Sequence, residues 1–246
     1  MAVTAGRAAV VAGVGPSQGL GAALARRFAA AGKTVFIVGR TLHRLQQVAE
    51  EIEQSGGRAI PVVADATREE DVSALFSVVD RFGFEMDLLT CTVDKNHPES
   101  LPETSRELFE SLWRANCLAA FLLGREAAFR MRRQGKGTII FTGASASLRA
   151  RPPFIAFASA KFALRALAQG MAREFGPEGI HVAHVVIDGV IDGERARRQF
   201  PDLVAGKGEE GLIRPESIAD LYWQLHCQPP DAWTHELDVR PHKESF

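Results

Sequence analysis

Residues 8–21 read AAVVAGVGPSQGLG, an apolar run followed by a glycine-rich turn and the start of a periodic segment. The run 8–12 has the length and composition of a buried strand. Residues 20–31 then place apolar side chains at a spacing of four, which is typical of a helix. A strand, a glycine turn and a helix in this order predict a βα unit of a parallel sheet.

The rest of the chain continues this alternation of apolar runs and helical periodicity. Further strands are expected at 34–38, 59–63, 87–90, 138–141, 182–187 and 235–239. Further helices are expected at 42–54, from 67 onward, at 104–132, at 156–174 and at 216–226. We therefore predict one α/β domain over residues 1–246, a doubly wound parallel sheet (Rossmann fold) with helices on both faces. Such sheets bind ligands at the carboxyl ends of their strands.

Two capping boxes are predicted at helix starts. Thr67 with Glu70 has the spacing for the third helix, and Thr104 with Glu107 has it for the long helix ending near Arg132.

Composition excludes several classes of protein. The formal net charge is −1 over 246 residues, which gives no electrostatic basis for binding nucleic acid or an anionic membrane. Met1–Ala12 lacks the layout of a signal peptide, and no apolar run approaches the roughly 18 residues of a membrane helix. Three cysteines without metal-ligand spacing indicate reduced thiols, no metal site and a cytoplasmic location.

The glycine turn predicts a dinucleotide site. A pyrophosphate binds the free amides and the dipole of a helix N-terminus, and glycines let it approach the backbone. The candidate cofactor residues in the turn are Gly13, Gly15, Ser17, Gly19, Leu20 and Gly21. The register of the glycine motif stays open, because its first glycine could be Gly13 or Gly15. The alternative is an ordinary strand-to-helix turn.

The second strand ends at Gly39-Arg40, where an NAD site usually carries a carboxylate for the ribose 2′-hydroxyl. Arg40 instead suits a 2′-phosphate, so NADP(H) is favoured over NAD(H). The alternative for Arg40 is a solvated strand end. Asp65, after the third strand, is expected either to accept from the adenine amino group or to cap the next helix.

With these features the chain resembles the short-chain dehydrogenase/reductase (SDR) family along essentially its whole length. The resemblance rests on the glycine turn, Asp65-Ala66, Asn116, Lys161 and the segment FGPEGI at 175–180. It implies oxidation or reduction of a small carbonyl or alcohol substrate. It also implies a homodimer or homotetramer built on helices 105–131 and 156–174.

The resemblance also assigns roles to single residues. Lys161 would hold the ribose hydroxyls of the cofactor and act in catalysis, and Asn116 would support a water in a proton relay. Ala66, Gly189 and Ile191 occupy positions expected to contact the cofactor. The stretch 189–214 occupies the place of a mobile segment that covers the substrate.

The chain departs from the family pattern at the centre of the site, which makes it an atypical member. Phe157 stands four residues before Lys161, where the family has its proton-carrying Tyr. Ala144 stands where the family has the Ser that binds the substrate oxygen. Phe has no proton to give, and Ala offers no hydrogen bond. The family's Asn-Asn-Ala-Gly is also replaced, by TCTVD at 90–94.

Other residues are candidates for the missing groups. Ser145 is one position from the Ser site and is a tentative catalytic residue. Asp94 and Asp188 lie at strand ends on the expected edge and are candidate proton carriers or turn caps. Ser159 is expected to face away from Phe157, and His184 to be a core histidine.

Three functions therefore remain open. The first is an NADP(H)-dependent oxidoreductase with altered proton delivery. The second is a catalytically inactive nucleotide-binding or regulatory protein. The third is a non-redox lyase, isomerase or cyclase that uses the same pocket.

Overall fold

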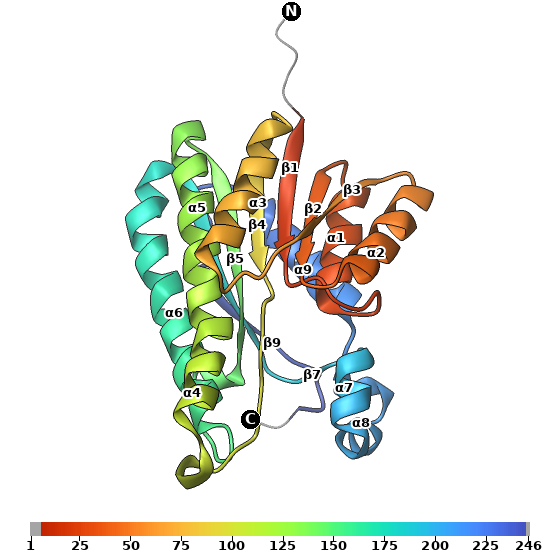
Figure 1. Ribbon diagram of the computed structural model, residues 1–246, viewed down its shortest axis with the longest axis vertical. Helices are drawn as coiled ribbons and strands as arrows, with labels where there is room; N and C mark the ends of the chain where they lie inside the picture. The colour runs from red at the N-terminus through yellow and green to blue at the C-terminus, as the bar shows by residue number, and fades with distance from the viewer. Residues whose placement is uncertain (1–5, 245–246) are drawn as a thin grey trace, which may run out of the picture.

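Seven strands form one parallel sheet in the computed structural model, which describes residues 6–244 (Figure 1). They are β1 (Arg7–Ala12), β2 (Thr34–Gly39), β3 (Arg58–Val63), β4 (Glu85–Cys91), β5 (Gly137–Ala144), β6 (Ile180–Ile187) and β9 (Glu236–Val239). Their order in the sheet is β3-β2-β1-β4-β5-β6-β9. The order therefore reverses between β1 and β4, and connections leaving those strands diverge to open a crevice.

The helices form layers on both faces of the sheet (Figure 1). They are α1 (Leu20–Ala30), α2 (Leu42–Gln54), α3 (Glu69–Arg81), α4 (Arg106–Trp113), α5 (Ala119–Gln134), α6 (Ile155–Phe175), α7 (Glu194–Gln199), α8 (Pro201–Lys207) and α9 (Pro215–His226). Apolar side chains of α1, α2 and α9 form one core, and those of α3, α5 and α6 form the other. The predicted doubly wound α/β fold is confirmed.

Some of the expectations about the chain ends fall outside this description. The single domain was expected over 1–246, and the absence of a signal peptide over Met1–Ala12. Residues 1–5 and 245–246 lie outside the described residues. Within 6–244, no helix combines the length and apolar character needed to cross a membrane.

The predicted cap at Thr67 is wrong. Helix α3 begins at Glu69 with Arg68 as its N-cap, and no side chain caps it. The Thr67 hydroxyl instead donates to Asp65 Oδ1 at 2.8 Å, and the Thr67 amide donates to the same oxygen at 2.9 Å.

The cap predicted at Thr104 is also wrong. Ser105 caps α4 and accepts from the Leu108 amide at 3.1 Å. The long helix expected over 104–132 is broken by a π-helical turn at Arg114–Leu118, and α5 then continues to Gln134. A π turn inserts one extra residue, which local periodicity does not reveal.

The stretch 189–214 contains more regular structure than the sequence indicated. The strands β7 (Val190–Ile191) and β8 (Leu212–Ile213) pair in a small second sheet. The helices α7 and α8 lie between them. This part of the chain stands apart from the main sheet, beyond the carboxyl ends of its strands (Figure 1).

Candidate active site

The glycine turn is held by backbone contacts that leave no room for side chains. Gly13 has a φ of +101°, and its amide donates to Val38 O at 3.0 Å. A Cβ at Gly21 would lie 2.8 Å from Gly13 O, and one at Gly39 would lie 2.2 Å from Val14 O. Gly15, in contrast, faces open space. Gly13 therefore makes the tight turn, and the space beside Gly15 is free for a ligand.

The first turn of α1 offers unpaired amide groups. Its N-cap is Gly19, which supplies no side-chain bond, so the amides of Leu20 and Gly21 have no acceptor within the helix. These donors and the helix dipole favour an anion. A pyrophosphate fits the donor set at this place.

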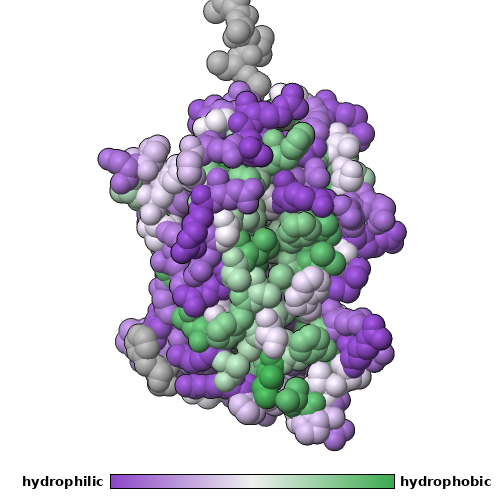
Figure 2. Space-filling view, turned by 90° about the vertical axis from the view of Figure 1, so that its left-hand side faces the viewer, coloured by the Kyte–Doolittle hydropathy of each residue, from purple (hydrophilic) through white to green (hydrophobic). Residues whose placement is uncertain are grey.

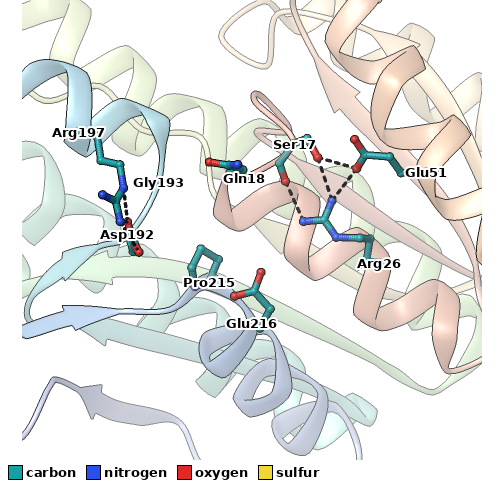
Figure 3. Close-up of a pocket in the computed structure, with 9 residues that line it drawn as sticks. All are labelled: Ser17, Gln18, Arg26, Glu51, Asp192, Gly193, Arg197, Pro215 and Glu216. Atoms are coloured by element: carbon teal, nitrogen blue, oxygen red, sulfur yellow. Dashed lines mark hydrogen bonds and ion pairs between the residues drawn. The ribbon is translucent and has the colours of Figure 1, made fainter. Parts of the chain in front are cut away.

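Ser17 belongs to the turn and is bonded to side chains of α1 and α2. Its hydroxyl donates to Glu51 Oε2 at 2.5 Å, and Arg26 donates to Ser17 O at 2.8 Å. Figure 3 shows these groups at one end of a cavity of about 490 Å³. Asp192, Gly193, Arg197, Pro215 and Glu216 line the rest of that cavity with Gln18. Ser17 thus binds α1 to α2 through Arg26 and Glu51.

Arg40 and Asp65 lie at the carboxyl ends of neighbouring strands. Arg40 is exposed just after β2, and Ala66 is buried beside Asp65 after β3. Burial raises the pKa of Asp65, but bonds from Thr67 and the charges of Arg40 and Arg68 outweigh it and hold the pKa below its ordinary value. Arg40 thus interacts with the ionised Asp65 through its charge, and its side chain makes no hydrogen bond or ion pair with another residue of 6–244.

Lys161 extends from α6 to the carboxyl end of β5. The residue is only 2% exposed. Its ammonium donates to Thr142 O at 3.1 Å and pairs with Asp94 Oδ1 at 3.1 Å. The Phe157 ring lies one helical turn away, with its centroid 5.5 Å from the ammonium. Lys161 thus lies at the carboxyl ends of the strands, as the sequence predicted. The ring beside it, Phe157, has no hydroxyl that could donate a proton.

Asn116 lies within the π turn and fixes the segment after β4. Its amide nitrogen donates to Leu112 O at 2.9 Å and to Lys95 O at 2.8 Å. Its buried side-chain oxygen has no partner among the described residues. By binding the backbone of Lys95, Asn116 fixes the chain next to Asp94.

The segment after β4 also touches the glycine turn. The Thr92 hydroxyl donates to Ala12 O at 3.0 Å, and a Cβ at Gly13 would lie 2.6 Å from that hydroxyl oxygen. Residues 92–94 therefore connect the turn after β1 with Lys161. The sequence showed that the family's Asn-Asn-Ala-Gly is replaced here, but it did not reveal the contact between Thr92 and Ala12.

The Ser position is occupied by Ala144, whose amide donates to Ser147 Oγ at 3.2 Å. Ser147 is fully buried, so it serves the backbone rather than a substrate. Ser145 is half-buried and its carbonyl accepts from Leu148 and Arg149. Ser159 is exposed and donates to Ile155 O, facing away from Phe157 as expected.

The chain after β6 runs back toward the glycine turn. Asp188 is buried between Arg149 at 3.0 Å and Arg240 at 3.3 Å. A Cβ at Gly189 would meet Pro241, and one at Gly193 would lie 3.1 Å from Gln18 O. Ile191 is half-buried and belongs to β7. The segment thus passes beside the site, where Gly189 and Ile191 were expected to contact a cofactor.

Buried histidine and cysteine side chains belong to the core. His184 is fully buried with Nδ1 2.9 Å from Glu236 Oε2, and burial lowers its pKa. Burial raises the pKa of the Cys91 thiol to about 11 and also raises that of Cys117. These thiols stay protonated at neutral pH and are weak nucleophiles. Among residues 6–244 no cluster of three or more acidic, His or Cys side chains could hold a metal ion.

The comparisons with known proteins agree with the fold. Residues 8–202 match the sequence profile of the short chain dehydrogenase family. The chain belongs to this family. Its members are oxidoreductases that bind nicotinamide cofactors and act on small molecules, and they are usually oligomeric.

Similar proteins cover more than nine-tenths of the chain. A short-chain dehydrogenase structure from Rhodopseudomonas palustris is 38% identical, with a TM-score of 0.83, over 96% of this chain and 99% of that one. A metagenomic short-chain oxidoreductase solved with NADP is 26% identical, with a TM-score of 0.81, over 96% and 98%. Dehydrogenase/reductase SDR family member 11 of Bos taurus is 27% identical over 92% of this chain and 93% of its own.

Proposed function

We propose that this protein is an NADP(H)-dependent oxidoreductase of a small carbonyl or alcohol, with proton delivery that departs from the family pattern. The observation that carries the proposal is the buried Lys161 ammonium. It lies at the carboxyl end of β5, and residues 92–94 connect it to the glycine turn. One edge of the sheet would then hold both the pyrophosphate and a ribose of an extended dinucleotide.

The proposed cofactor contacts follow the strand order. The turn from Gly13 to Gly21 and the first amides of α1 would hold the pyrophosphate. Arg40 would pair with the 2′-phosphate, and Asp65 with Ala66 would border the adenine. Lys161 would donate to the ribose hydroxyls, with Gly189 and Ile191 alongside. The family member solved with NADP supports this choice of cofactor.

The bound cofactor would supply or accept a hydride, so the chain's own residues would have to place the substrate and move a proton. Phe157 and Ala144 offer no group for either task. Asp94 is a poor acid. Burial alone would raise its pKa, but the charges of Lys161 and Arg195 have the larger effect, so the pKa is lowered and the carboxylate stays ionised. Ser145 is the proposed contact to the substrate oxygen. The unpaired oxygen of Asn116 is a place for the water of a proton relay.

Residues 189–214 are proposed to cover the bound substrate. Most side chains of α7 are exposed, and the segment reaches the site through the pairing of Arg195 with Asp94 at 2.8 Å. A segment that opens locally has few buried contacts and many exposed side chains.

The apolar surface of α4, α5 and α6 supports a homodimer or homotetramer. Figure 2 views this side of the molecule and shows an apolar area along it. Phe129 is 60% exposed, and Phe109, Trp113, Phe121 and Phe162 are at least 40% exposed. Exposed apolar groups gathered on one face mark interaction sites. Sedimentation of the parent and of Phe129→Glu tests this, with a smaller species expected for the variant.

A nucleotide-binding protein without turnover is the second candidate function. The observation in its favour is that Asp94 already pairs with Lys161, while Phe157 stands in place of the proton carrier. A non-redox lyase, isomerase or cyclase would instead form product with no net change in the cofactor. A cytoplasmic location accompanies each function, and it is supported by three cysteines that are free of disulfides.

Nicotinamide fluorescence titrations with NADPH and NADH test the cofactor directly. Tighter binding of NADPH is expected, and equal or tighter binding of NADH would contradict the role of Arg40. Stopped-flow measurement of NADPH oxidation with a panel of ketones, aldehydes and enones then tests turnover. Binding without oxidation of NADPH by any of them would favour the second candidate.

A further inference from the structure

Three charged side chains form an ion bridge between α6 and α7. Lys161 Nζ on α6 lies 3.1 Å from Asp94 Oδ1, and Asp94 Oδ2 lies 2.8 Å from Arg195 Nη1 on α7. Asp94 itself belongs to neither helix, because it follows β4. The two oxygens of one carboxylate therefore connect the proposed cofactor lysine to the segment proposed to cover the substrate.

The hydrogen bonds of Lys161 limit what the bridge can do when a cofactor is present. An ammonium has three donors, and Thr142 O and Asp94 already take two. The ribose of the proposed cofactor offers two hydroxyls, so one present acceptor must leave. Thr142 O is fixed in β5, whereas Asp94 has Arg195 as a second partner for its charge. Asp94 is therefore the partner that is displaced.

We propose that Asp94 is a positioning residue that couples the cofactor site to α7. It shares its charge between Lys161 and Arg195 in the free protein. Once ribose hydroxyls occupy Lys161, the charge goes to Arg195 alone, and α7 is held more firmly. This inference rests on the proposed function, because it requires a nicotinamide dinucleotide beside Lys161.

The surroundings of Asp94 keep it in place for this exchange. Asn116 holds the next residue, Lys95, through its backbone oxygen at 2.8 Å. Gln199 accepts from Arg195 Nε at 3.2 Å and orients the guanidinium from within α7. Burial raises the pKa of Asp94, but the two cations outweigh it, so the carboxylate stays charged at neutral pH.

The test combines NADPH titration with hydrogen exchange of residues 194–207, measured with and without NADPH. Asp94→Asn removes the competitor for Lys161, so NADPH should bind about 2- to 5-fold more tightly while its protection of α7 is lost. Arg195→Gln leaves Asp94 to Lys161 alone, so NADPH should bind about 2- to 5-fold more weakly, again without protection. Arg198→Gln is the matched control, since Arg198 pairs with Glu194 inside α7. It should change neither quantity.

The double variant separates the bridge from a simple change of charge. If Arg195 acts through Asp94, Arg195→Gln has no further effect on NADPH binding in the Asp94→Asn protein. If it weakens binding there as much as in the parent, the two charges act independently and the coupling is overturned. A parent protein that binds NADPH without protecting α7 also overturns it, whereas one that binds no NADPH overturns the proposed function as well.

Discussion

Strand β4 has an Asp–Lys ion pair at each end, and the two pairs differ in their access to water. At the amino end, Asp87 lies 2.6 Å from Lys33, and both side chains are about 5% exposed. Just beyond the carboxyl end, Asp94 lies 3.1 Å from Lys161 but keeps 28% of its side chain exposed. The first pair is closed to ligands because both side chains are buried, and Arg7 lies on the other Asp87 oxygen at 3.7 Å. The second pair has a side that is open to solvent. The same pair of residue types can thus stabilise the fold at one end and serve a site at the other.

Breaking the pair at the amino end should have the largest effect. Lys33→Met leaves the buried Asp87 charge without its nearest partner, so the free energy of unfolding should fall by about 3–5 kcal/mol in urea denaturation at pH 7. Adding Asp87→Asn should restore much of the loss, because no isolated charge then remains. Asp94→Asn is the comparison at the other end and should cost less, because Asp94 is 28% exposed and an asparagine oxygen can still accept from Lys161. Equal losses from Lys33→Met and Asp94→Asn would contradict the distinction.

Restoring the family's proton carrier should act only at the carboxyl end. Ala144→Ser with Phe157→Tyr places hydroxyls beside Lys161, and kcat/KM for carbonyl reduction should rise by about 100-fold. The free energy of unfolding serves as the control, since a large fall would show that the added groups disturb the core. No gain in rate from a folded double variant that binds NADPH would count against this geometry.

Arg40 should control the choice of cofactor more weakly. Arg40→Ala removes a charge-assisted contact to a 2′-phosphate, so the Kd for NADPH should rise about tenfold. The Kd for NADH should change less than twofold, because NADH has no phosphate there. Arg44→Ala is a matched control on α2, and a similar loss in both variants would indicate general attraction rather than a specific contact.

Acid should weaken the amino end through His226. Burial, followed by the charge of Lys33, lowers the pKa of His226 to about 4 from about 6.5 in the unfolded chain. The folded state therefore binds this proton less readily. The contribution to stability is complete above pH 6.5 and is lost as the pH falls toward 4, at up to about 1.4 kcal/mol per pH unit. His226→Gln should remove this slope in denaturation curves recorded between pH 7 and 4.5, and an unchanged slope would assign it to other groups.

Local patterns predicted the sheet and most of the helices, because burial imposes a period on each element. The position of the glycine turn was also predicted correctly, because it depends on local contacts. Gly13 and Gly21 meet within nine residues of chain. The π turn at Asn116 was missed because one inserted residue is not revealed by local periodicity. The bond from Asn116 to Lys95 was missed because Lys95 lies on another segment.

The site was predictable only as single residues. Lys161 was named as a candidate, but Asp94, which pairs with it, and Arg195, which pairs with Asp94, come from segments 67 positions before and 34 positions after it. No local period records such a pairing. Thr67 shows the opposite failure, since its spacing to Glu70 fits a cap while the Asp65 carboxylate takes its hydroxyl. A local pattern thus predicts which hydrogen bonds a residue could form, whereas the bonds that it does form depend on the neighbours that the fold brings to it.

The contact between Gly39 and Val14 has a consequence for how this chain could change over time. A side chain at position 39 would begin 2.2 Å from Val14 O, so even one methyl group there would push the first turn out of place. An acidic side chain at this position would clash with Val14 O, whether or not it could reach a ribose. A descendant with a different nucleotide preference would have to alter neighbouring positions or first reshape the loop at 13–15. The close packing of two backbones thus leaves some mutational routes open and closes others.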